Sequence, residues 1–588
     1  AIPMGKAAWV ADRAVQIGAL LFAAIYFVSG LLYLCLSYWD VTAQDFWRLY
    51  YVCLNYPWLE STLFKVNNHS VILPTLIWLA NLRFFHGSHQ VLFIIGLTLL
   101  LISTALLLLP VWRDRAIDLT GKCLATLALS FGSFWMGRAM ITTSGGFNIM
   151  TSLVVLGAAV AFLLLPKLAR SYSPDWRTTS LIVLAGLLAS FSFGTGLALW
   201  PTLLFLGWYL RVPWRSLAIL LVAAAFVVVF YRLLPPPDRN LVFRADAKSP
   251  GLFSITALQH LCTLVGGPVF YSVAALQETR VSPGLIRSSG WLLWGGAAGL
   301  VLAAVVAFPR LRRRDLKGNS IEFIGLALIS LNLCALMLIV AGRVLHFQKL
   351  PFEIAAPRYL FWSSLFWTGI LLVTIHHASR RPWLRWPCIL VVFGFPLLAW
   401  QAQRDEGFRG RYARFLADES AISLINGVTD PARLLAPHQE DVDQLLPTLR
   451  ARRLDMFADG LQDWIGQPVA QLFGGREKRG PFRGRAALQR LKGGRDQDSA
   501  VKVSGQLVAE GRPPHHMVIV NPAGTVVGVA CSSGSNRFLN RLLYGGRMPN
   551  GRLAGYIKNY NTDTRYSLRA AGPDGVSTER IAIAPLAR

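Results

Sequence analysis

The chain has 588 residues, of which 54% are hydrophobic and 15% are charged, with 58 Lys and Arg against 31 Asp and Glu. Soluble proteins carry about 25% charged residues, so this composition excludes a soluble or a disordered protein. The net charge of +27 does not indicate a nucleic-acid partner. Instead, apolar runs of about 20 residues alternate with short basic segments, which is typical of a polytopic α-helical membrane protein.

The charges divide the chain into two regions. Residues 401–588 hold 27 Lys and Arg and 18 Asp and Glu, whereas residues 1–400 hold 31 and 13. We therefore expect a membrane domain that is poor in acids, followed by a polar domain.

Eleven segments are apolar and long enough to cross a hydrocarbon core of about 30 Å. They cover residues 16–37, 90–112, 121–138, 147–167, 179–195, 197–212, 215–234, 289–308, 321–342, 360–379 and 387–401. Ser70–Phe85 is also apolar, but it contains Pro74, Asn81 and Arg83. We expect this segment to lie flat at the outer surface of the membrane.

The basic residues set the orientation. With Ser70–Phe85 outside and the amino end in the cytoplasm, the inner loops hold 18 Lys and Arg, and the outer side of the membrane domain holds the other 13 over longer segments. The positive-inside rule favours this arrangement, because short cytoplasmic loops are enriched in Lys and Arg. The carboxyl-terminal domain is then extracytoplasmic.

The first outer loop, residues 38–89, is rich in Trp, Tyr and Phe with single charges between them. Such a composition is typical of the headgroup level and predicts two or three short amphipathic helices on the membrane surface. Residues 253–278 are expected to form a similar surface helix.

Seven carboxylates of the membrane domain fall on the outer side: Asp40, Asp45, Glu60, Asp238, Asp246, Glu278 and Glu353. Asp45 is our first candidate for a general base and Asp40 the second, since both follow the first span directly. A carboxylate at the apolar boundary is costly unless it is used or paired, and partial desolvation makes it a stronger base. Asp45 could equally cap a surface helix or pair with Arg48.

Basic residues at the outer boundary suit a lipid phosphate, which attracts positive charge and several hydrogen-bond donors. Arg138 lies where a span emerges outside, and Arg343, Lys349 and Arg358 bracket a short outer loop. Each of them taken singly could also reach toward lipid headgroups.

Three further residues are candidates for binding a substrate: Asn68, His69 and Glu353. Asn68 and His69 share the aromatic first loop with Asp45 and could bind a sugar hydroxyl or a phosphate. No metal-ligand spacing is evident, so we predict neither a metal site nor a cofactor, although a divalent ion stays open.

This arrangement resembles the GT-C superfamily of polyprenyl-phosphate-sugar-dependent membrane glycosyltransferases. The resemblance lies in an inner amino end, one span, a long outer loop with an early Asp, and many further spans. Within the loop, Asp45-Phe46-Trp47 precedes VNNHSVILPTLIWL, which is similar to the first-loop pattern of bacterial members, often Asn-Glu-His-Arg before an apolar helix. The Glu and Arg of that pattern are absent here, which puts a role of His69 in doubt.

The resemblance covers about residues 10–400 and implies a reaction. In these enzymes the first-loop Asp deprotonates the acceptor hydroxyl, and basic residues stabilise the departing polyprenyl phosphate. Carried over, Asp45 would be the base, and Arg138, Lys349 and Arg358 would bind the phosphate. The resemblance also implies a bacterial cytoplasmic (inner) membrane and a monomeric enzyme without an obligatory metal. Pilin arabinosyltransferases and cell-wall arabinofuranosyltransferases are among the relatives to consider.

The polar region divides into three parts. Residues 401–475 have apolar residues at helical spacing, and residues 476–500 form a basic, Gly-rich stretch that we expect to be a linker. Residues 501–588 contain short alternating strands, which predict a β-sandwich. This sandwich resembles carbohydrate-binding domains, with Tyr556, Tyr560 and Tyr566 as sugar platforms or, more simply, as packing residues.

We therefore expect a glycosyltransferase that moves one sugar from a polyprenyl phosphate to an extracytoplasmic glycan, lipid or pilin-type protein. An O-antigen polymerase or ligase, which joins whole glycans, is the rival enzyme and would not need Asp45. A transporter or a glycan-binding membrane protein is the non-enzymatic alternative. Transporters tend to place charges at mid-membrane in repeated halves, and no clear repeat is present.

Overall fold

The structure is a computed structural model. It describes residues 6–66, 69–138, 142–170, 175–235, 254–276, 290–313, 320–474, 476–478, 482–491, 493, 499–509, 515–533, 537–544, 551–572 and 575–586. The chain forms two compact units. Unit 1 comprises Ala1–Cys35, Trp58–Ile77 and Phe93–Gly407, and unit 2 comprises Leu36–Pro57, Trp78–Leu92 and Phe408–Arg588. Residues 38–89 are thus divided, and part of them belongs with the carboxyl-terminal region.

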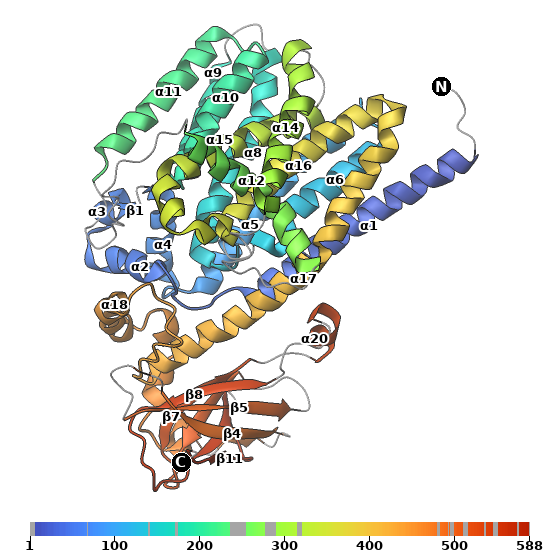
Figure 1. The fold of residues 1–588 in the computed structure, drawn as a ribbon. Coiled ribbons are helices and arrows are strands. Elements are labelled where there is room, and N and C mark those ends of the chain that lie inside the picture. The colour runs from blue at the N-terminus through green and yellow to red at the C-terminus, as the bar shows by residue number, and fades with distance from the viewer. Residues whose placement is uncertain are drawn as a thin grey trace. The chain divides into compact units, whose positions relative to one another are not determined.

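Unit 1 is built from helices (Figure 1). Its helices, some of which continue into unit 2, are α1 (Lys6–Ser37), α3 (Trp58–Leu63), α4 (Ile72–Phe84), α5 (His89–Arg113), α6 (Leu119–Phe134), η1 (Met136–Arg138), α8 (Gly145–Arg170), α9 (Trp176–Ser190), η2 (Gly194–Ala198), α10 (Leu199–Tyr209), α11 (Trp214–Leu233), α12 (Ile255–Leu276), α14 (Gly290–Arg313), α15 (Ser320–Lys349), η4 (Pro351–Ala355), α16 (Pro357–Arg380) and α17 (Pro382–Ile425). A two-stranded hairpin, β1 (Lys65–Val66) and β2 (His69–Ser70), precedes α4.

The protein carries helices suited to a membrane. Within the described ranges, eight are long and apolar enough to cross one: α1, α5, α8, α11, α14, α15, α16 and α17. Each coincides with one of the eleven predicted spans, so the prediction of a polytopic helical membrane protein is confirmed at this level.

The other three predicted spans are shorter helices. Segments 121–138, 179–195 and 197–212 correspond to α6, α9 and α10, with 16, 15 and 11 residues. At 1.5 Å per residue, 11 residues extend only about 16 Å. Between α9 and α10 the chain makes the short 3-10 helix η2, in which a Cβ on Gly196 would lie 1.9 Å from the carbonyl oxygen of Ala189. This close approach explains why position 196 is a glycine and why α9 and α10 are separate helices.

Helix α12 lies in the segment 253–278, which the sequence predicts to be a surface helix. It packs against α14, α15 and α16. At its contact with α14, a Cβ on Gly266 would lie 1.9 Å from the carbonyl oxygen of Leu292, and one on Gly296 would lie 1.6 Å from that of Cys262. Small residues allow two backbones to approach this closely, as is common between membrane helices.

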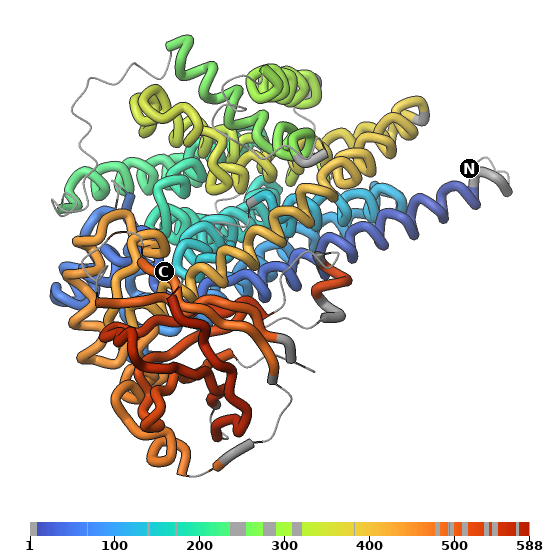
Figure 2. Tube along the Cα trace, turned by 60° about the horizontal axis from the view of Figure 1, so that its bottom comes forward, coloured from blue at the N-terminus to red at the C-terminus, as the bar shows by residue number. Residues whose placement is uncertain are grey.

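Unit 2 contains a few helices and one sheet (Figures 1 and 2). Its helices are α2 (Phe46–Asn55), α18 (Gln439–Arg452), η5 (Asp455–Phe457), η6 (Leu461–Trp464), α19 (Val469–Phe473) and α20 (Arg537–Tyr544). Its strands are β3 (Glu477–Lys478), β4 (Phe482–Arg490), β5 (Val501–Ala509), β6 (His516–Val520), β7 (Val526–Ser532), β8 (Arg552–Ile557), β9 (Ser567–Gly572), β10 (Gly575–Ser577) and β11 (Ile581–Ala584).

The sheet closes on itself. Its strand order is β11-β4-β5-β8-β7-β6-β9-β10-β3, and β11 also pairs with β9. Strand β11 is parallel to β4 and antiparallel to β9, so it joins the two ends of the curled sheet. Val503, Met517, Ile519 and Leu568 are buried inside. The predicted β domain is confirmed, but it is a closed barrel and not a two-sheet sandwich, because β11 bridges what would otherwise be two edges.

The segment expected to be a linker, residues 476–500, contains strand β4. This strand pairs with β5 over nine residues, from Phe482 opposite Ala509 to Arg490 opposite Val501. Ala486 and Leu488 face the core while arginines alternate with them. The many basic residues concealed this alternation, which the presence of β5 turns into a paired strand.

The last predicted span is part of a longer element. Helix α17 has 44 residues and continues past residue 400, the expected start of the polar domain. At 1.5 Å per residue it extends about 66 Å, roughly twice the thickness of a hydrocarbon core. The colour change from yellow to orange follows it in Figures 1 and 2.

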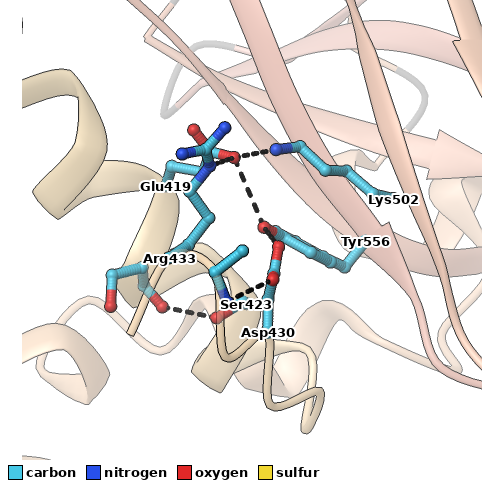
Figure 3. A network of polar contacts seen from close by, with 8 residues as sticks. Glu419, Ser423, Asp430, Arg433, Lys502 and Tyr556 are labelled. Carbon is cyan, nitrogen blue, oxygen red and sulfur yellow. Dashed lines mark hydrogen bonds and ion pairs between the residues drawn. The ribbon is translucent and has the colours of Figure 1, made fainter. Parts of the chain in front are cut away.

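Within unit 2, a network of polar contacts joins the end of α17 to the barrel (Figure 3). Glu419 of α17 is buried, and its Oε1 accepts a hydrogen bond from Arg433 Nε at 3.0 Å and pairs with Lys502 of β5. Tyr556 of β8 donates a hydrogen bond to Asp430 at 2.8 Å and lies 3.5 Å from Glu419. Burial and the two carboxylates raise the pKa of Tyr556, so its proton stays in the network.

Candidate functional site

Unit 2 holds a cluster of carboxylates around the segment that joins α1 to α2. Asp40 lies in this segment, and its neighbours Trp39, Val41 and Thr42 are buried. We call Asp40, His89, Asp418 and Asp455, with the nearby Arg414, the carboxylate cluster. It brings together residues that are hundreds of positions apart in the chain.

The best-defined contacts of the cluster involve Thr42. Its backbone N–H donates to Asp455 Oδ2 at 3.0 Å, and its hydroxyl lies 3.2 Å from His89 Nε2. His89 Nε2 and Asp455 Oδ1 are 3.8 Å apart. Asp455 also donates its own backbone N–H to the carbonyl oxygen of His86 at 2.7 Å. Thr42, through its backbone and its hydroxyl, therefore contacts both Asp455 and His89 two residues after Asp40.

Burial makes all three of these carboxyls unusually basic. It raises the pKa of Asp40 and of Asp418 from the ordinary value of 3.8 to about 6. Asp418 and Asp455 add to the rise at Asp40, and the positive charge of Arg414 opposes it. Burial likewise raises the pKa of Asp455 to about 6, against the hydrogen bonds from Thr42 and the backbone. A carboxyl that titrates near neutral pH is suited to general acid–base work.

Asp45, the first candidate for a base, is not part of the carboxylate cluster. It is half-buried at the N-cap of α2, but its side chain makes no capping hydrogen bond there. Arg48 pairs with Asp441 of α18, its Nε donating to both carboxylate oxygens at 3.0 and 3.1 Å. The structure thus gives the Asp45 side chain no helix-capping role, and the carboxylate that Arg48 binds at both oxygens is that of Asp441.

Unit 1 holds a second group, which we call the arginine cluster: Arg343, His346, Glu353, Arg358 and Tyr359. The guanidinium groups of Arg343 and Arg358 lie over the ring of Tyr359, with their Cζ atoms 5.8 and 5.2 Å from its centroid. Arg358 also forms an ion pair with Glu353. The structure therefore brings together two of the four predicted phosphate-binding residues and one predicted substrate-binding residue.

The charge balance of the arginine cluster favours an anion. Two arginines face one carboxylate, and the buried hydroxyl of Tyr359 has no hydrogen-bond partner among the described residues. Arg358 is the second residue of α16, the end at which the helix dipole disfavours a cation. A bound phosphate would stabilise such a site, because it would neutralise the guanidinium of Arg343 and accept a hydrogen bond from the hydroxyl of Tyr359.

His69 lies in the same unit and is buried. Its ring packs against Phe193 with the centroids 4.9 Å apart, and a Cβ on Gly194 would lie 2.1 Å from its Nδ1. Burial, together with the charge of Arg343, lowers the pKa of His69 to about 4. The imidazole is therefore neutral at pH 7, and it can exchange hydrogen bonds but cannot pair with a phosphate as a cation.

Three other predicted residues are not part of either cluster as described. Arg138 ends the 3-10 helix η1. Lys349 is exposed at the end of α15, and no hydrogen bond or ion pair joins its side chain to the described residues of the arginine cluster. Asn68 lies outside the described residues.

The predicted sugar platforms of the β domain have different environments. Tyr556 is fully buried in the network of Figure 3, and Tyr566 packs in the barrel core. Only Tyr560 is half-exposed, with its ring 5.9 Å from that of Tyr566. The first two are packing residues in this structure.

No group of three or more His, Cys, Asp or Glu is placed to hold a metal ion in the part of the chain that the structure describes. Comparisons of the chain with models of known protein families, with curated proteins and with solved structures found no match. The two clusters themselves are therefore the features of this protein that bear on its function.

Sequence reasoning did not find His89, Asp418 or Asp455. It sought acids only in the membrane domain and took the region after residue 400 as an accessory part. No local pattern marks Asp455, although its backbone has a positive φ of 54°, which is uncommon for a residue other than glycine. Only the fold reveals these residues.

Proposed function

We propose that this protein is an integral membrane glycosyltransferase that moves a monosaccharide from a polyprenyl-phosphate donor to an extracytoplasmic glycan, lipid or protein acceptor. The observation that carries the proposal is the arginine cluster. Two guanidinium groups meet over one tyrosine ring where the apolar helices α15 and α16 succeed each other.

A lipid-linked donor fits this location. Its polyprenyl tail stays in the bilayer and its phosphate lies at the membrane boundary, so the protein must present positive charge at the end of apolar helices. Arg343 and Arg358 supply that charge, and they can stabilise the phosphate as it leaves, when its negative charge increases.

The base in this proposal is Asp40 or Asp45. It takes the proton of the acceptor hydroxyl while the acceptor oxygen forms a bond to the anomeric carbon. The bond between that carbon and the phosphate oxygen breaks, and polyprenyl phosphate departs with the electron pair. Asp40 has the stronger case because its pKa of about 6 makes it a better base than an ordinary carboxylate while leaving it ionised at neutral pH.

The proposal includes a finer arrangement. The short helices α6, α9 and α10 complete eleven membrane segments, the amino end is cytoplasmic, and the carboxyl-terminal domain is extracytoplasmic in the bacterial inner membrane. The barrel would contact the acceptor glycan. The enzyme would act as a monomer and without a metal.

The test is a transfer assay with the purified full-length protein and labelled polyprenyl-phosphate sugars, with release of polyprenyl phosphate as the readout. We expect Arg343→Ala and Arg358→Ala each to lower kcat by roughly 100-fold, the usual effect of removing one group that stabilises developing charge. Asp40→Asn should lower it by about 100- to 10,000-fold, as for a general base.

The matched control is Arg215→Ala. Arg215 also lies over an aromatic ring, that of Trp214 at 5.8 Å, but it is exposed and distant in sequence from both clusters. Its loss should leave the rate unchanged. Release of polyprenyl phosphate that survives in both Asp40→Asn and Asp45→Asn would contradict the base assignment and favour a glycan-joining polymerase or ligase.

A further inference from the structure

The segment that carries Asp40 needs a support. Residues 38–45 form no helix or strand, yet Trp39, Thr42 and Ala43 are buried. Gln44 donates its backbone N–H to the carbonyl oxygen of Leu435 at 2.7 Å, and Thr42 donates its own to Asp455 Oδ2 at 3.0 Å. The position of Asp40 is therefore fixed by residues from beyond position 408.

A buried carboxylate such as that of Asp455 is energetically costly as a structural support. The side chain of Asp455 is only 1% exposed, and no Lys or Arg pairs with it within the described ranges. Its Oδ1 has no hydrogen-bond donor there, and its backbone φ is +54°. An asparagine would accept the same hydrogen bond from Thr42 and tolerate this backbone better, without a buried charge. A purely structural support would not require the carboxylate.

Several titratable and charged groups surround the Asp455 carboxylate or face Asp40. The charge of Asp455 acts on Asp40 and also on Tyr50, whose pKa it helps to raise. His89 lies 3.8 Å from it and is held by the hydroxyl of Thr42. Arg414, whose guanidinium lies 4.2 Å from the ring centroid of Tyr38, and Asp418 complete the charges that face Asp40.

We propose that Asp455 is a positioning residue for the transfer reaction: it holds the Asp40 segment through the backbone of Thr42 and places a buried carboxylate, next to His89, in the cluster that contains Asp40. This inference rests on the proposed function, in which Asp40 is the base. It makes the carboxyl-terminal region part of the reaction centre and not only a sugar-binding accessory.

Two substitutions separate the two effects of Asp455. Asp455→Asn keeps an oxygen that can accept from Thr42 but removes the charge, whereas Asp455→Ala removes both. The acidic limb of the kcat/KM profile reports the pKa of the free enzyme's base. Because the charge of Asp455 raises the pKa of Asp40, Asp455→Asn should move this limb to lower pH.

Hydrogen exchange tests the support independently of catalysis. In the intact protein in nanodiscs, Asp455→Ala should speed exchange of the amide of Thr42 at least tenfold, and Asp455→Asn should leave it protected. Asp441→Asn is the matched control, because Asp441 is another carboxylate bound to the first-loop region, through Arg48. It should move neither the acidic limb nor the exchange of Thr42.

The outcomes can be told apart. An acidic limb that stays in place in Asp455→Asn overturns the electrostatic role, and a protected Thr42 amide in Asp455→Ala overturns the positioning role. If Asp40→Asn keeps full activity, the proposed function loses its base and the electrostatic role falls with it. The exchange of Thr42 would still show whether Asp455 supports the segment.

Discussion

Two of the buried acidic residues in unit 2, Glu419 and Asp455, have contrasting partners. Glu419 meets Arg433 and Lys502, so its negative charge is matched by two positive ones (Figure 3). Asp455 meets Thr42, His89 and the backbone of Met456 but no Lys or Arg among the described residues, and its Oδ1 has no hydrogen-bond donor there. A paired and hydrogen-bonded buried charge stabilises a fold, whereas an unpaired one costs stability and is retained where it serves a reaction. The contrast separates a structural network from a candidate reaction centre within one compact unit.

The largest loss of stability should come from breaking the network around Glu419. Glu419→Ala leaves Lys502 and Arg433 without their carboxylate, and Lys502 is only 13% exposed. Breaking a buried ion pair on one side costs about 3–5 kcal/mol. Thermal unfolding of the detergent-purified protein should show this loss, and an unchanged unfolding temperature would mean that the network does not hold α17 to the barrel.

The second largest change in stability should be a gain, from Asp455→Asn. Asp455 has a folded-state pKa of about 6 against 3.8 ordinarily. The folded protein therefore binds this proton more tightly than the unfolded chain, so its stability falls as the pH rises from about 4 to about 6. Asparagine cannot ionise. Asp455→Asn should therefore raise the free energy of unfolding by up to about 3 kcal/mol at pH 8 and leave it unchanged at pH 4. Unfolding at both pH values checks this, and a loss of stability at pH 8 would place Asp455 with Glu419 as a structural residue.

A smaller loss is expected at the pair of Arg48 and Asp441. The two side chains are 12% and 13% exposed, and Arg48 donates to both carboxylate oxygens. Because water partly screens the pair, Asp441→Asn should cost about 1–2 kcal/mol, between the surface and the buried limits. The same unfolding measurement applies, and transfer activity below the unfolding temperature should be retained.

The smallest effect should come from the exposed pair of Arg453 and Asp463, whose side chains are 66% and 50% exposed. Exposed ion pairs contribute about 0–1 kcal/mol. Asp463→Asn should therefore shift stability by less than about 0.5 kcal/mol. A larger loss would show that the neighbourhood of Asp455 is more sensitive than its contacts indicate.

Much of the fold could be predicted from local patterns. The eight long apolar helices coincide with predicted segments, and the strands β5 to β9 with predicted alternation. The alternation of apolar residues did not predict those elements whose structure depends on a partner far away in the sequence. Strand β4 was concealed by its arginines until β5 paired with it, and the barrel closes only because β11 reaches both β4 and β9.

The candidate site divides in the same way. Arg343, Glu353 and Arg358 lie within 16 positions of one another, so a single short loop indicated a common charged group. Whether they share one tyrosine ring could not be read from that spacing. Asp40, His89 and Asp455 are separated by 49 and 366 positions, and no pattern connects them.

By itself, the sequence determined that this chain belongs in a membrane, with a polar domain after its apolar helices, because hydrophobicity and helical length are local properties. The tertiary structure alone decided which charges meet. Burial, pairing and pKa depend on neighbours that the chain brings together only when it folds, and it is this neighbourhood that distinguishes Asp455 from Glu419.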